Sequence, residues 1–116
     1  MKFVLLGEWT TQNQYISADR QGYGWVIKKA ETKRVREELK EQWDGTYPSK
    51  SIFKFTWYMC NRRTDPDNVC AFARKVILDG MQKAGIIDND GWKQVAGFED
   101  SFYVDKDNPR VEIELI

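Results

Sequence analysis

Apolar and polar residues alternate along residues 51–59 with the period of a β-strand. One face of that strand carries Phe53, Phe55, Trp57 and Met59. Residues 110–116 repeat the pattern, with Val111, Ile113 and Leu115 on one face. Less regular apolar runs predict two more strands, over residues 2–8 and 92–104. The pattern therefore predicts about four strands.

The helical period appears in residues 66–84, where apolar side chains recur every three or four positions. Asp65 is a favourable N-cap, Pro66 suits the first helical position, and Gly85 is a natural stop. Residues 31–43 carry a narrower apolar stripe, which predicts a second helix lying on a sheet. Residues 9–23 are polar and predict turns.

These elements predict an α+β fold. The 116 residues contain no repeat or linker and suit a single small domain, a mixed sheet of about four strands with two main helices packed on it. The first apolar run is too short for a secretory signal or a membrane span. We therefore expect a soluble cytoplasmic protein with no membrane partner.

Composition narrows the possible chemistry. The chain has no histidine and only two cysteines, which nearly excludes an ordinary zinc site and also excludes nucleophiles activated by imidazole. Any catalysis must use carboxylates, lysine, tyrosine or a metal-bound water. Residues 1–64 hold 12 basic and 7 acidic side chains and residues 65–116 hold 6 and 11, so the halves carry +5 and −5. This asymmetry suits a metal-dependent nuclease, although solvated charges on two amphipathic faces would also explain it.

Carboxylates cluster around the helix predicted over residues 66–84. They are Asp65, Asp67, Asp79, Asp88 and Asp90. A hard divalent ion such as Mg²⁺ takes all-oxygen ligands of this kind. Taken singly, each aspartate also has a structural explanation: Asp65 as an N-cap, Asp67 as a favourable charge in the first turn, and Asp88 and Asp90 as a polar loop. Asp79 would pair with Lys75 or Lys83 at four-residue spacing, or would support the site from behind the metal ligands. The geometry favours function, because Asn68, Lys75 and Asp79 fall on one line of the helix.

Five features follow one another in a fixed order in the central part of the chain: Asp65-Pro66-Asp67-Asn68, a lysine, Leu78-Asp79, residues 83–87 and a final acidic pair. With these features, the central part of the chain resembles the RusA family of Holliday-junction resolvases. The match runs from about Arg62 to Val95, with weaker similarity over most of the chain. The resemblance implies a RusA-like fold and a small homodimeric, Mg²⁺-dependent endodeoxyribonuclease. Such enzymes make paired nicks in four-way DNA junctions during recombination and repair, and are commonly encoded by phages and prophages.

The resemblance also implies roles for particular residues. Asp65, Asp67 and Asp90 would be catalytic and would hold Mg²⁺, with Mn²⁺ as a possible substitute. Lys75 would be catalytic through its charge near the scissile phosphate, and Asn68 would position a metal ligand or the phosphate. Asp88 would assist Asp90 or replace it as a metal ligand.

The chain departs from the family pattern before Lys75. The family's lysine falls where this chain has Ala71, so Lys75 matches only if about four residues are an inserted helical turn. Arg74, or Arg62 and Arg63, would then supply the charge instead.

Two basic groups are candidates for contact with substrate phosphates. Arg62 and Arg63 precede the acidic block, and the second group is Lys28, Lys29, Lys33 and Arg34. Trp9 and Trp25 are the tryptophans that we expect to meet an unstacked base.

Two alternatives remain open from the sequence. One is a catalytically inactive RusA-like phage accessory protein that binds branched DNA. The other is a nuclease of the same fold that cleaves flaps or forks.

Overall fold

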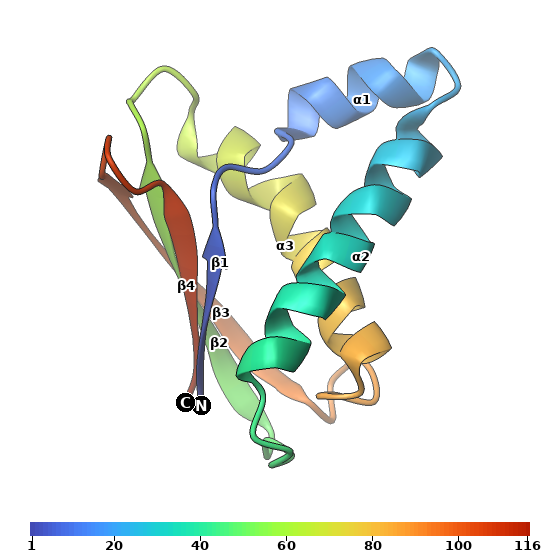
Figure 1. Cartoon of the computed structure of the whole chain (residues 1–116), viewed down its shortest axis with the longest axis vertical. Coiled ribbons are helices and arrows are strands. Elements are labelled where there is room, and N and C mark those ends of the chain that lie inside the picture. The colour runs from blue at the N-terminus through green and yellow to red at the C-terminus, as the bar shows by residue number, and fades with distance from the viewer.

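A four-stranded mixed sheet forms one layer, and three helices cover one of its faces (Figure 1). The computed structural model describes residues 1–116. The elements in chain order are β1 (Lys2–Leu6), α1 (Gln12–Arg20), α2 (Gly24–Gln42), β2 (Ser51–Met59), α3 (Pro66–Ala84), β3 (Val95–Val104) and β4 (Arg110–Leu115). The predicted α+β fold is confirmed, with one helix more than expected. None of the helices is long and apolar enough to cross a membrane.

The strands lie in the order β1-β4-β2-β3. β4 pairs antiparallel with both β1 and β2, whereas β3 runs parallel to β2 along the edge of the sheet. Parallel neighbours need a crossover connection, and α3 provides it. The start and the end of α3 therefore lie near opposite ends of β2 and β3 (Figure 1).

The core lies between the sheet and α3. Phe53, Phe55 and Trp57 on β2 are at most 2% exposed. Ten of the nineteen residues of α3 are buried, which makes it the most buried helix. The strand face and the helix face predicted from the apolar pattern are both confirmed.

Helix α3 begins and ends where the sequence predicts. Pro66 occupies the first turn, where its missing N–H costs nothing. Gly85 takes a left-handed conformation with φ of 85°, which suits glycine and ends the helix.

Helix α1 replaces the turns that were predicted for residues 9–23. Thr11 and Gln14 form a reciprocal capping box at its start. Tyr15 stacks on Phe72 of α3, with 4.1 Å between the ring centroids. The capping box and this stacking contact help to stabilise a helix whose own sequence is mostly polar.

Helix α2 begins seven residues earlier than predicted. Its first residue, Gly24, is buried, and a Cβ there would lie 2.8 Å from the side chain of Asp19. Glycine therefore permits the tight approach of α2 to α1. Three strands are shorter than predicted: β1 ends before Gly7, where φ is 82°, β3 begins after a turn over residues 91–94, and β4 stops at Leu115.

Helices α2 and α3 touch where α3 has no side chain. A Cβ on Gly80 would lie 2.4 Å from Cγ1 of Val35 and 3.2 Å from the carbonyl oxygen of Thr32. This contact brings the exposed faces of the two helices together beside the core.

Candidate functional site

Two aspartates mark the start of α3. Asp65 occupies the N-cap position, but its exposed carboxylate makes no capping hydrogen bond. Asp67, in the first turn, accepts a hydrogen bond of 2.9 Å from the backbone N–H of Asn68. The nine ion pairs of the chain include neither residue. Both carboxylates therefore face solvent at the positive end of a helix dipole without a cationic partner.

A surface cleft of about 580 Å³ lies beside Asp65. Arg62 lines the same cleft, so a cation and a carboxylate face one solvent space. Phe102 and Tyr103 from the end of β3 form an apolar wall. Arg63 is exposed in the same loop, and neither arginine forms an ion pair within the chain. The loop before α3 thus presents free positive charge next to free negative charge.

Asn68 joins the start of α3 to α1. Its Oδ1 accepts a hydrogen bond of 2.8 Å from the backbone N–H of Asn13. The amide oxygen is therefore engaged, which leaves the amide NH₂ as the group that could contact a phosphate.

A chain of alternating charges occupies the middle of α3. The Lys75 ammonium lies 3.2 Å from one oxygen of Asp79 and 3.6 Å from an oxygen of Asp90. Lys28 of α2 lies 3.8 Å from the other oxygen of Asp79. Burial lowers the pKa of Lys75, but the hydrogen bonds and charges of Asp79 and Asp90 outweigh it, so the net pKa is raised. Lys75 is therefore held in its charged form between two carboxylates.

The aspartates at the two ends of α3 do not meet within one chain. No three acidic or cysteine side chains gather into a group that could hold a metal ion. Ten positions separate Asp65 from Lys75, the partner of Asp90, which corresponds to about 15 Å of helical rise. Asp88 is exposed in the loop beyond α3. The pair Asp65 and Asp67 fits Mg²⁺ by its chemistry, because this ion often binds through one or two carboxylates and keeps several waters. A third ligand from Asp90 has no support in the geometry of the single chain.

Arg74 is directed into the fold. Its guanidinium pairs with Asp100 of β3, whose other oxygen accepts a hydrogen bond of 2.9 Å from the indole N–H of Trp57. The same guanidinium lies 5.0 Å from the ring centroid of Phe98. Arg74 therefore fastens β3 to α3 instead of facing solvent.

Arg34 is also engaged within the chain. It pairs with Glu38 at 3.1 Å, donates to the carbonyl oxygen of Leu6, and stacks 3.7 Å from the ring centroid of Trp9. Trp9 is itself only 9% exposed, so the expectation that it meets a base is wrong.

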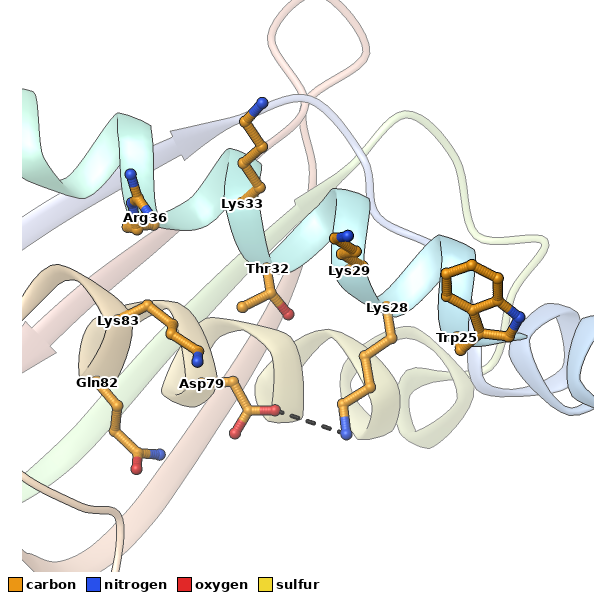
Figure 2. Close-up of a pocket in the computed structure, with 9 residues that line it drawn as sticks. All are labelled: Trp25, Lys28, Lys29, Thr32, Lys33, Arg36, Asp79, Gln82 and Lys83. Atoms are coloured by element: carbon orange, nitrogen blue, oxygen red, sulfur yellow. Dashed lines mark ion pairs between the residues drawn. The ribbon is translucent and has the colours of Figure 1, made fainter. Parts of the chain in front are cut away.

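The remaining basic residues form a groove of about 540 Å³ between α2 and α3 (Figure 2). We call this the α2–α3 groove; its lining residues are Trp25, Lys28, Lys29, Thr32, Lys33, Arg36, Asp79, Gln82 and Lys83. Arg36 and Lys83 were absent from the residues expected to bind substrate. Spacing alone could have identified Arg36, because residues 29, 33 and 36 share one face of a helix whereas residue 34 is turned by about 100°.

Comparison with known proteins adds one finding. The family model described as Endodeoxyribonuclease RusA matches residues 9–116, which is nearly the whole chain. The comparison with curated proteins finds no match.

Proposed function

The chain belongs to the RusA family of endodeoxyribonucleases, which implies nuclease activity of the Holliday-junction-resolving kind, and we propose that it cuts DNA junctions at the start of α3. The observation that supports this location is the pair Asp65 and Asp67, whose carboxylates have no cationic partner. We propose that the cut depends on a divalent metal, and that paired nicks serve DNA recombination and repair in the cytoplasm.

Asp65 and Asp67 would hold the metal. Bound there, Mg²⁺ would supply a water of lowered pKa and would stabilise the charge that develops on the phosphate oxygens. The dipole of α3 favours negative charge at this end, which suits two exposed carboxylates there. Mn²⁺ takes the same oxygen ligands and would substitute for Mg²⁺.

Arg62 and Arg63 would bind the DNA backbone next to the scissile phosphate. Arg62 shares its cleft with Asp65, so a phosphate bound there would lie beside the carboxylate of Asp65. Arginine suits phosphate because its planar fork donates two parallel hydrogen bonds. Asn68 would add its amide N–H groups from the first turn of α3.

Lys75, Asp90 and Asp88 have a less direct role in this proposal. Lys75 would contribute positive charge from the middle of α3, and Asp90 would hold it in place. Asp88 would become a metal ligand only if the loop after α3 moved toward the start of the helix. Arg34 and Arg74, which are engaged within the fold, are not included among the DNA contacts.

Paired nicks require two active sites. A four-way junction has approximate two-fold symmetry, and a homodimer with an isologous interface would present two copies of the start of α3 to it. We therefore propose that the active form is a homodimer.

A nicking assay tests the proposal. End-labelled four-way junction and linear duplex are incubated with the protein and Mg²⁺, with Mn²⁺, or with chelator, and the strands are resolved on a denaturing gel. We expect paired nicks in the junction only when metal is present. Asp67→Asn should abolish nicking and retain junction binding, whereas Asp107→Asn, which removes the same charge from the exposed β3–β4 turn, should nick normally.

Each other outcome rejects part of the proposal. Retained nicking by Asp67→Asn would refute the site. Tight binding by the unaltered protein without nicking under either metal would indicate the inactive accessory protein, and cleavage of flaps or forks in preference to junctions would change the substrate.

A further inference from the structure

Most of the basic side chains in the α2–α3 groove have no acidic partner within the chain. Asp79 is its only acidic residue, and that carboxylate already contacts Lys75 and Lys28. Lys33 makes only a 4.0 Å contact with Glu37, while Lys29, Arg36 and Lys83 form no ion pair. Unpaired cations that share one groove repel one another. They are stabilised when a polyanion lies along them.

The cations form a row. Lys29, Lys33 and Arg36 of α2 are four and three positions apart, so they repeat about once per 5.4 Å turn along one side of the helix. Figure 2 shows them between Trp25 at one end and Arg36 at the other. A row of charges over several turns matches a chain of phosphates better than a single small anion.

The groove is distant from the proposed cutting site. Asp79 and Lys83 lie 14 and 18 positions after Asp65 on the same helix, which corresponds to about 21 to 27 Å of rise. Phosphates on one strand of B-DNA advance about 3.4 Å per base pair. The groove would therefore meet the backbone about six to eight base pairs from the nick.

Trp25 lies at the end of the groove toward the first turns of α3 (Figure 2). Its side chain is 65% exposed. A tryptophan this exposed on a positively charged surface is suited to stack on an unpaired base, because every base presents a π-face.

From these observations we propose that the α2–α3 groove binds the DNA backbone of a junction arm about six to eight base pairs from the nick. We further propose that Trp25 stacks on an unpaired base at the end of the groove nearer the branch. The distance to the nick rests on the proposed function, whereas the binding itself does not.

Binding measured in chelator tests the groove without any chemistry. The probes are labelled four-way junctions with arms of about 15 base pairs, or of about 5 base pairs closed by hairpin loops. Lys29→Ala/Lys33→Ala is compared with Lys50→Ala/Lys106→Ala, which removes two lysines that are also exposed but lie outside the groove. On long arms the groove variant should bind about fivefold or more weakly, and its plot of log K against log salt should be shallower by about 2.

On short arms the groove variant should bind like the unaltered protein, because those arms do not reach the groove. If the groove variant loses as much affinity on short arms as on long arms, the proposed distance between groove and nick is wrong. If the control variant loses as much affinity as the groove variant, the proposed role of the groove is wrong. The binding assay contains no metal, so its result does not depend on nicking. If the protein shows this binding pattern but does not nick junctions in the metal-containing assay, the proposed function is refuted and the proposed role of the groove is retained.

Trp25 is tested on the same probes. Trp25→Ala should weaken binding to a junction with unpaired bases at the branch by about tenfold and binding to linear duplex by less than twofold. Trp25→Phe should restore most of the affinity, and Tyr47→Ala, at a 72% exposed aromatic residue outside the groove, should change little. Equal weakening on duplex and junction, or no rescue by phenylalanine, would overturn the stacking role.

Discussion

The start of α3 and its second half both carry aspartates, yet the two regions differ in what surrounds the carboxylates. Asp65 and Asp67 face solvent with no cation within the chain. Asp79 lies within 4.0 Å of two lysines, and Asp90 lies 3.6 Å from one of them. The chain therefore neutralises its own negative charge in the second half and leaves it unneutralised at the start. The pair that forms no ion pair is the one that we propose as the metal site.

The largest expected effect comes from removing a carboxylate at the start of α3. Asp65→Asn should lower the rate of junction nicking at least a hundredfold, about the loss seen when one stabilising group leaves an active site. Asp79→Asn should lower it less than about tenfold, since that carboxylate serves Lys75 and Lys28. Initial rates on one labelled junction check both. Equal losses would show that the two regions do not differ in function.

Arg74 offers a test of stability. Arg74→Met should lower the free energy of unfolding by about 2 kcal/mol, because it leaves the largely buried Asp100 without its cation. Urea denaturation followed by circular dichroism measures the change. Asp100→Asn serves as a partner variant that retains an acceptor for Trp57. An unchanged urea midpoint for Arg74→Met would return Arg74 to the candidates for DNA contact.

Lys75 is the next residue of α3, and its replacement should have a smaller effect. Lys75→Met removes two ion pairs at a side chain that is 53% exposed, so we expect a loss below about 1 kcal/mol. A unit charge about 15 Å away at an effective dielectric constant near 20 is worth about 1 kcal/mol, so nicking should fall at most about fivefold. A hundredfold loss with an unchanged urea midpoint would instead place Lys75 at the scissile phosphate.

The smallest effect concerns a paired carboxylate far from α3. The hydrogen bond from Arg110, helped by Lys2, outweighs burial and holds the pKa of Glu112 below its ordinary value. Its stabilising contribution is thus present above the unfolded pKa of about 4.3 and is lost as the pH falls through the lower folded pKa. Glu112→Gln should reduce stability by a few tenths of a kcal/mol at pH 7 and flatten its decline as the pH falls below about 4.

Thermal unfolding across that pH range compares the variant with Glu114→Gln, an exposed neighbour that forms no ion pair. Parallel pH profiles for the two variants would contradict the role of Arg110.

Local signals explain which parts of the fold the sequence could predict. Helix α3 was predicted to the residue because a cap, a proline and a glycine mark its ends. Helix α1 was missed because the residues that it contacts are distant in the sequence, such as Phe72, which lies 57 positions after Tyr15. The start of α2 was misplaced because the narrow apolar stripe supports a helix only over residues 31–43, whereas the helix begins at Gly24, which allows close contact with Asp19.

In the candidate site, too, the contacts that local spacing sets could be predicted, and the contacts between distant residues could not. The pairing of Lys75 with Asp79 follows from four-residue spacing, and the structure confirms it. The contact with Asp90 needs the loop after Gly85 to fold back, which no local pattern shows. Likewise, the sequence makes Arg34 and Arg74 candidates for contact with DNA, and only their tertiary partners reveal that they are engaged within the fold.

The pairing of β1 with β4 sets an order of events for folding. Phe3 lies opposite Ile113, so this ladder closes a loop of about 110 residues, whereas β2, α3 and β3 are contiguous in the chain. Loop-closure entropy grows with the length of chain enclosed, which favours early formation of the β2-α3-β3 unit and late docking of β1. Amide hydrogens of β1 should therefore gain protection from exchange last during refolding. During synthesis on the ribosome, β1 therefore cannot pair until β4 has been made.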